Sequence, residues 1–273
     1  MAMAKSVAKG SEKSSCARVR AVKALAWLMA ALAAVVLFGL VDLGTLLGWS
    51  DPRYAWAVPL EASWGALLTF VISGSYVWIA LVPDRSWPAV VQLGISGTAL
   101  AVAGAAGLDG SPVWLAVPVA GSAFMFAWLT RETAGNFPRS WSLNPAHLLL
   151  AAAGVMIRAP YAFHALAISR TGSVHDDTWG INHWPVQGAT GLTLGACALA
   201  MACWVPARVL LRLTVAMSAA WIGAADLAYP DRAGAMDGPL WGICVVLWGT
   251  AVALPLPAEC LKRSRVPGRR PRR

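Results

Sequence analysis

The chain has 273 residues, of which 58% are hydrophobic and only 13% are charged, and its mean hydropathy is +0.60. A soluble domain carries about a quarter charged residues, so this composition excludes an ordinary water-soluble protein. The net charge of +9 is concentrated at the two ends, since no lysine lies between Lys23 and Lys262. Beside apolar segments, such basic clusters are typical of topology signals and of contact with anionic lipid. We therefore expect membrane lipid, and not nucleic acid, as the partner of these ends.

Apolar stretches of about 20 residues, the length that crosses a bilayer, follow one another along the chain. They predict an all-α, polytopic transmembrane helix bundle of about eight spans, at 22–48, 55–82, 87–108, 112–130, 146–169, 184–204, 207–229 and 238–258. The first stretch follows a basic start but is too long for a signal peptide, and we expect a retained helix. The sixth and seventh stretches meet at Val205-Pro206 and could instead form one kinked element.

Basic residues between the expected spans indicate the orientation of the bundle. With the N-terminus in the cytoplasm, only Arg53, Arg170 and Arg232 fall in outer loops. The positive-inside rule therefore predicts a multi-pass protein of the cell membrane with both termini cytoplasmic. Residues 1–21 and 259–273 are expected to be basic cytoplasmic tails of a transmembrane domain at 22–258.

Ionisable residues within the expected spans are the first candidates for chemistry, because charge inside a membrane is costly. They are Asp42, Glu61, Arg158, His164 and Asp226. At about 1.5 Å per residue, the acids and the histidine lie within roughly 10 Å of the outer surface, and Arg158 lies deeper. A structural ion pair of Arg158 with Asp42 or Glu61 is one interpretation. One arginine cannot pair with three acids, so at least one carboxyl group is expected to be hydrated, protonated or used.

The fifth span adds a proline beside the arginine, in Arg158-Ala159-Pro160-Tyr161. Proline inside a helix frees a carbonyl group and favours a kink, which could be either an ordinary packing kink or the wall of a cavity. Tyr161 and His164 can share one helix face. With Trp64 and Trp221, they are predicted to bind substrate in an apolar pocket, where aromatic rings stabilise positive charge.

The outer loop after this span carries four residues that could ligate a divalent metal, His175, Asp176, Asp177 and His183. The residue types suit Zn, Mn or Fe. Their spacing matches no standard zinc motif, and a solvated polar loop is the alternative. No other cofactor is expected.

Two acids, one early in the second span and one late in the chain, suggest a family. They are Glu61 in Glu61-Ala62-Ser63-Trp64 and Asp226 in Asp226-Leu227-Ala228-Tyr229. The pattern resembles the small integral-membrane terpene cyclases of meroterpenoid and indole-terpenoid pathways. The resemblance implies that Glu61 and Asp226 handle a proton, although that family typically has seven helices.

These observations predict a membrane-embedded enzyme acting on an isoprenoid or other lipid-like substrate, with proton-initiated terpene cyclisation as the reaction that the resemblance implies. Glu61, Asp226 or Asp42 would donate or accept the proton, and Arg158 would hold an anionic group or set the acidity of the carboxyl groups. The alternatives are a small proton-coupled transporter or export or immunity protein, and a structural membrane subunit. No inverted repeat of the usual transporter kind is apparent.

Overall fold

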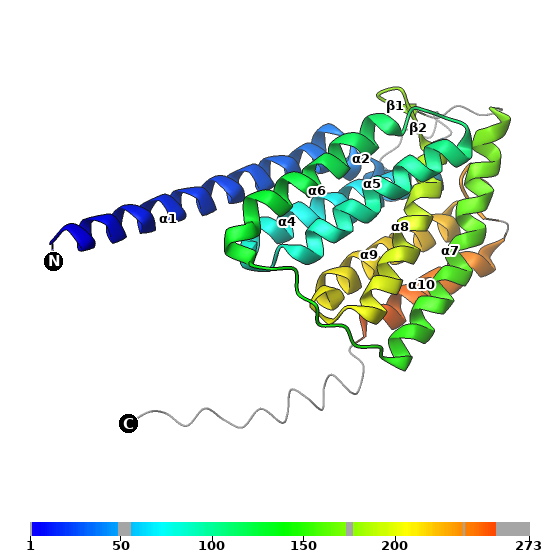
Figure 1. Cartoon of the computed structure of the whole chain (residues 1–273). Coiled ribbons are helices and arrows are strands. Elements are labelled where there is room, and N and C mark those ends of the chain that lie inside the picture. The colour runs from blue at the N-terminus through cyan, green and yellow to red at the C-terminus, as the bar shows by residue number, and fades with distance from the viewer. Residues whose placement is uncertain (1, 49–55, 173–176, 237, 255–273) are drawn as a thin grey trace.

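The computed structural model describes residues 2–48, 56–172, 177–236 and 238–254, with side chains described from Cys16 onward. These residues form a helical bundle with one small β-hairpin (Figure 1). The elements are α1 (Ala2–Ala31), η1 (Leu32–Val36), α2 (Gly39–Thr45), α3 (Val58–Gly65), η2 (Ala66–Ser73), α4 (Gly74–Leu81), η3 (Pro83–Arg85), α5 (Trp87–Gly107), α6 (Val113–Ala134), α7 (Pro145–Thr171), β1 (Asp177–Thr178), β2 (Ile181–Asn182), α8 (His183–Cys203), η4 (Val205–Ala207), α9 (Arg208–Ala228) and α10 (Pro239–Ala253). The all-α prediction is thus nearly met in this part of the chain, where β1 and β2 are the exception.

Seven helical segments of the described chain are long and apolar enough to cross a membrane. They are Cys16–Thr45, Val58–Leu81, Trp87–Gly107, Val113–Ala134, Pro145–Thr171, His183–Cys203 and Val205–Ala228. They correspond to the first seven expected spans. The eighth stretch forms α10, an apolar helix of 15 residues.

The chain between α8 and α9 breaks the helix, so the sixth and seventh stretches are two helices. Trp204 adopts an extended conformation (φ −117°, ψ 105°), and Pro206 lies in the short turn η4 that follows. The indole N–H of Trp204 donates to the carbonyl group of Pro138 at 2.8 Å. A contact with the α6–α7 connection therefore fixes this break.

The first span is interrupted where its α-helix gives way to the π-helical turn η1. Phe38 then takes a left-handed conformation (φ 60°), and α2 begins at Gly39. The interruption leaves the carbonyl group of Leu37 to accept the indole N–H of Trp64 at 2.9 Å. By contrast, α7 continues as one α-helix through Pro160, where the sequence predicted a kink.

Two glycines allow α2 to lie directly against the second span. A Cβ atom on Gly39 would lie 2.7 Å from the Thr69 hydroxyl oxygen, and one on Gly65 would lie 2.8 Å from the Gly39 carbonyl oxygen. The close approach brings Asp42, which is 6% exposed, into the bundle. The break in the first span therefore determines where this acid lies.

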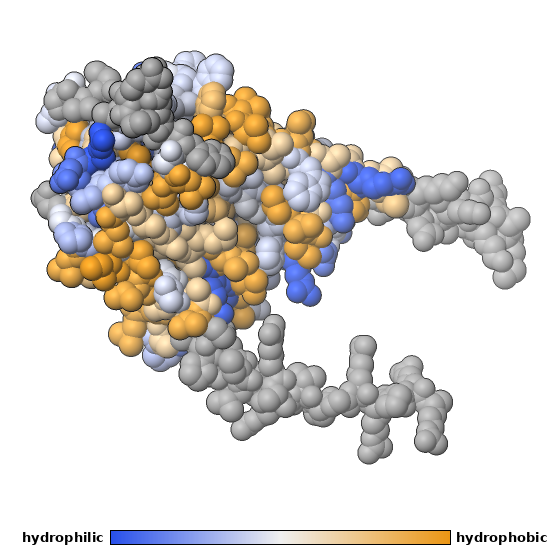
Figure 2. Space-filling model, turned by 180° about the vertical axis from the view of Figure 1, so that it is seen from behind, coloured by the Kyte–Doolittle hydropathy of each residue, from blue (hydrophilic) through white to orange (hydrophobic). Residues whose placement is uncertain are grey.

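Large apolar side chains cover much of the outside of the bundle, as the orange surface in Figure 2 shows. Examples are Phe124, Met156 and Phe163, each more than two thirds exposed. Inside, residues 58–68 of the second span and 181–191 of β2 and α8 are all buried. These two buried stretches, which lie against each other, are the centre around which the polar residues gather.

Candidate functional site

Buried polar side chains from five helices gather where α3 and the start of α8 meet. We call them the polar cluster: Asp42 of α2, Glu61 of α3, Arg158 and Tyr161 of α7, His183 and Gln187 of α8, and Asp226 of α9. None of them is more than 6% exposed. The three acids that the sequence singled out, Asp42, Glu61 and Asp226, all belong to this cluster.

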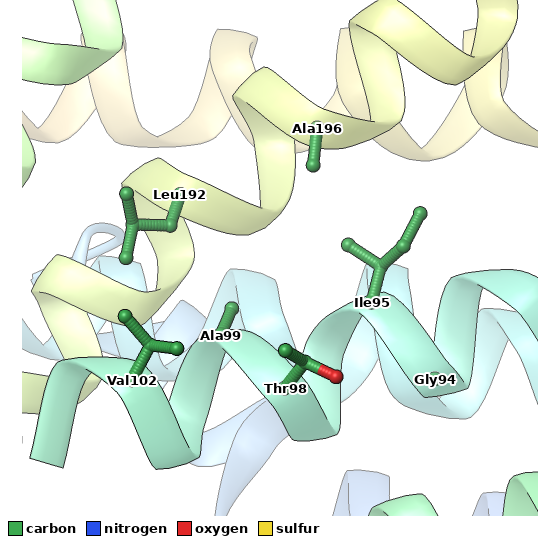
Figure 3. Close-up of a pocket in the computed structure, with 7 residues that line it drawn as sticks. All are labelled: Gly94, Ile95, Thr98, Ala99, Val102, Leu192 and Ala196. Atoms are coloured by element: carbon green, nitrogen blue, oxygen red, sulfur yellow. The ribbon is translucent and has the colours of Figure 1, made fainter. Parts of the chain in front are cut away.

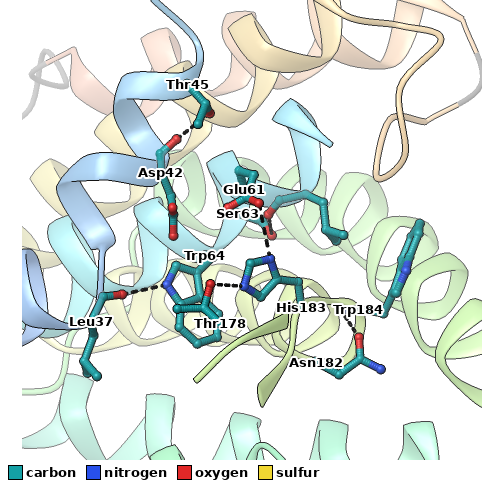
Figure 4. Close-up of polar contacts among 11 residues, drawn as sticks. Leu37, Asp42, Thr45, Glu61, Ser63, Trp64, Thr178, Asn182, His183 and Trp184 are labelled. Carbon is teal, nitrogen blue, oxygen red and sulfur yellow. Dashed lines mark hydrogen bonds and ion pairs between the residues drawn. The ribbon is translucent and has the colours of Figure 1, made fainter. Parts of the chain in front are cut away.

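An acid–base contact in the cluster joins Glu61 to His183. The Glu61 Oε1 atom lies 3.8 Å from His183 Nδ1, and His183 Nε2 lies 2.9 Å from the Thr178 hydroxyl oxygen. The ring of Trp64 packs on the imidazole with 4.6 Å between ring centroids. Figure 4 shows Asp42, Glu61 and His183 around this tryptophan. The imidazole thus lies between a carboxyl group on one side and a hydroxyl group that hydrogen-bonds its Nε2 atom on the other.

The β-hairpin before α8 places His183. Its turn residues Trp179 and Gly180 both have positive φ (58° and 71°), which suits a tight two-residue turn. The side chain of Asn182 accepts the backbone N–H of Trp184 at 3.1 Å and donates to Asp109 at 2.8 Å. The hairpin is thereby held against the α5–α6 connection, and the first residue of α8 turns into the bundle.

Arg158 is almost completely buried, at 1% exposed, and aromatic rings surround it. Its guanidinium carbon lies 5.6, 5.6 and 5.4 Å from the ring centroids of Tyr161, Trp241 and Trp248. None of its three nitrogens has a hydrogen-bond partner among the described residues, so it forms no ion pair with Asp42 or Glu61. Asp226 is the acid that interacts with it electrostatically.

The aromatic contacts of Arg158 offset only part of the cost of its burial. A cation over a ring is worth about 0.5–2 kcal/mol, while an arginine at the centre of a membrane costs roughly 2.5–3.5 kcal/mol or more. Each buried donor left without an acceptor adds about 1–3 kcal/mol. Arg158 is therefore short of hydrogen-bond acceptors among the described residues.

The α9–α10 connection covers the side of the cluster formed by Asp226 and Gln187. The backbone N–H of Met236 donates to Asp226 Oδ1 at 2.8 Å, and the Gln187 amide donates to the carbonyl group of Gly234 at 2.7 Å. Gly234 has φ +88°, and a Cβ atom there would lie 2.6 Å from the backbone nitrogen of Leu60. Only glycine lets this connection lie so close to α3.

Gly234→Ala is expected to lower the free energy of unfolding by about 1–3 kcal/mol more than Gly238→Ala, the usual cost of overpacking. Both glycines have positive φ, but a Cβ atom on Gly238 would meet nothing within 4 Å. The difference between the variants therefore isolates the clash with Leu60. Chemical denaturation of the purified protein in detergent measures it. Equal losses in the two variants would show that the connection does not lie against α3.

Two of the predicted substrate-binding residues, Trp221 and His164, are only partly buried. Trp221 packs edge-on against Phe70 with 6.2 Å between centroids. His164 is half-buried and lies 6.5 Å from the ring of Trp184. The other two aromatic residues lie in the interior, Trp64 against His183 and Tyr161 against Arg158.

The predicted metal ligands do not form a site in the part of the chain that is described. His175 and Asp176 lie outside the described residues. Asp177 is exposed, while His183 turns inward to Glu61 and Thr178. No group of three or more His, Cys, Asp or Glu side chains that could hold a metal occurs among the described residues.

A separate groove lies on the surface between α5 and α8. Figure 3 shows its lining, which is Gly94, Ile95, Thr98, Ala99, Val102, Leu192 and Ala196, around a volume of about 490 Å³. It carries no titratable side chain. The groove has an apolar lining, and the buried titratable side chains lie in the polar cluster instead.

No family model, curated protein or solved structure matches the chain. Sequence reasoning did not single out Gln187, Trp241 or Trp248. A signal for each was present, since Gln187 lies four residues after His183 on the same helix face, and Trp241 and Trp248 are seven residues apart.

Proposed function

We propose that this protein is a membrane-embedded enzyme that acts on an isoprenoid or other lipid-like substrate by acid–base chemistry. The contact between Glu61 and His183 carries this proposal. A carboxyl group and an imidazole at 3.8 Å, both at most 3% exposed, can exchange a proton with a bound substrate while bulk water is kept away. Side chains of this kind are seldom placed in a membrane bundle for stability alone, because their desolvation is costly.

The proposed reaction is proton-initiated cyclisation, which the resemblance to membrane terpene cyclases implies. Protonating an alkene or epoxide requires a strong acid in a dry site. Glu61 is the proposed donor, and Asp42 and Asp226 are the further carboxyl groups that could return the proton. The rings of Trp64, Tyr161 and Trp221 are proposed to stabilise positive charge that develops on the substrate.

The proposed location is the cell membrane, with both ends of the chain in the cytoplasm. The distribution of basic residues supports this orientation, which places the polar cluster toward the outer surface. An even number of spans requires α10 to cross as the eighth.

Lipid extracts from an isoprenoid-producing host test the enzyme directly. Cells that express the wild-type protein are expected to accumulate a product, detected by mass spectrometry, that cells expressing Glu61→Gln or Asp226→Asn lack. Glu132→Gln is the matched control, because Glu132 is an exposed carboxylate that pairs with Arg18. A product that persists in both acid variants, or that never forms in the wild type, would refute the proposal.

The second candidate function is proton-coupled transport, and the interrupted first span favours it. Transporter binding sites are typically formed by discontinuous transmembrane helices, and here the turn η1 and Phe38 interrupt the first span just before Asp42. In sealed proteoliposomes, a transporter would show substrate flux that responds to a pH gradient. Flux in the absence of any product would select this alternative.

A further inference from the structure

The strongest feature that the acid–base chemistry does not use is the guanidinium group of Arg158. It has five N–H donors in a fixed fork. Three aromatic rings lie around it, and none of its nitrogens meets an acceptor among the described residues. A fork of donors held in an apolar enclosure fits an oxyanion with two or more oxygens.

Neighbouring side chains supply acceptors that are also unused. Asp226 Oδ2 and Gln187 Oε1 are buried and have no hydrogen-bond partner in the described structure. Asp226 interacts electrostatically with Arg158, and the Tyr161 hydroxyl lies beside the side chain of Gln187. Unfilled donors and unfilled acceptors thus occur in one neighbourhood.

This combination distinguishes among head groups. A carboxylate ion has only acceptors, so it would leave Asp226 Oδ2 without a donor. An alcohol has no charge to match Arg158. A phosphate monoester offers oxygens that accept from the guanidinium group and, when singly protonated, an O–H that can donate.

We propose that Arg158, Gln187 and Asp226 bind the phosphate group of an amphiphile whose apolar chain lies among the helices. The inference rests on the proposed function, since it names the class of the substrate. Gly234 and Met236 occupy the other hydrogen-bonding atoms of Gln187 and Asp226, so the phosphate would use Gln187 Oε1 and Asp226 Oδ2. The phosphate would then lie beside the aromatic rings that enclose Arg158.

Calorimetric titration in neutral maltoside detergent tests this site with dodecyl phosphate as the probe. The wild-type protein is expected to bind it saturably, at one molecule per chain, and at least tenfold more tightly than dodecanol, dodecanoate or inorganic phosphate. Arg158→Lys retains the charge but loses the fork, and is expected to bind at least tenfold more weakly. Arg170→Lys, on the exposed end of the same helix, is the control and should bind as the wild type does.

Several outcomes would overturn the proposal. These are no saturable binding to the wild type, equal binding of dodecanol or dodecanoate, or unchanged affinity in a folded Arg158→Lys protein. Equal affinity for inorganic phosphate would assign the site to free phosphate and rule out the amphiphile. If the Arg158 variant fails to fold, the titrations of the wild-type protein still test whether the site prefers the phosphate amphiphile. Binding of dodecyl phosphate without a product in the lipid extracts would refute the enzyme alone, and a product without this binding would refute only the phosphate site.

Discussion

Glu61→Gln and His183→Asn are each expected to lower turnover by roughly 10²–10⁴-fold, the usual contribution of a positioned acid or base. The reason is their contact, since the Glu61 carboxyl group lies 3.8 Å from the imidazole and Thr178 holds the other ring nitrogen. Neither replacement can donate or accept a proton at this position. Product formed per amount of purified protein, in membranes that contain the lipid substrate, measures the loss.

The double variant is expected to be no slower than the slower single variant. Residues that act as one unit show strongly non-additive losses, because removing either member already disables the other. Glu132→Gln, which changes a carboxylate outside the polar cluster, should retain wild-type turnover. Losses that multiply in the double variant would mean that Glu61 and His183 act in separate steps.

Gly65→Ala is expected to lower the free energy of unfolding by about 1–3 kcal/mol, as overpacking usually does. The added methyl group would lie 2.8 Å from the Gly39 carbonyl oxygen and from the Leu43 backbone nitrogen. Both are backbone atoms, so α2 as a whole would have to move away from α3. Since α2 carries Asp42, the same substitution should also shift this acid within the polar cluster.

Gly94→Ala provides the matched control for this helix glycine. A Cβ atom on Gly94 would meet nothing within 4 Å, so alanine should be neutral or should stabilise the helix by up to about 1 kcal/mol. Unfolding in a denaturing detergent, followed by circular dichroism, compares the two variants. Similar stabilities for Gly65→Ala and Gly94→Ala would contradict the close packing of α2.

The helical segments could be predicted from the sequence because length and apolar composition determine them. The gathering of the acids could also be predicted, because alternating direction along successive spans brings Glu61 and Asp226 to one end. The irregular parts of the backbone could not be predicted. The break at Phe38 contains no proline, and Gly39, which follows it, lies directly against the second span.

The direction of the His183 side chain at the candidate site could not be predicted from the sequence either. In the sequence it follows a polar loop and was predicted as a metal ligand. Its direction depends on the turn at Trp179-Gly180 and on the cap formed by Asn182, which start α8 at His183 itself. The surroundings of Arg158 were missed because Trp241 and Trp248 come from α10, far along the chain, and tertiary packing alone brings them to α7.

The separation of Glu61 and His183 along the chain has a consequence for how the protein is made. About 120 residues lie between them, and a ribosome needs roughly ten seconds for that length at ~5–20 residues per second. During this time α3 carries Glu61 without its neighbour His183, because α8 has not yet been synthesised. A nascent chain arrested within this interval should therefore expose Glu61 to chemical labelling, and this exposure should end only after α8 has emerged.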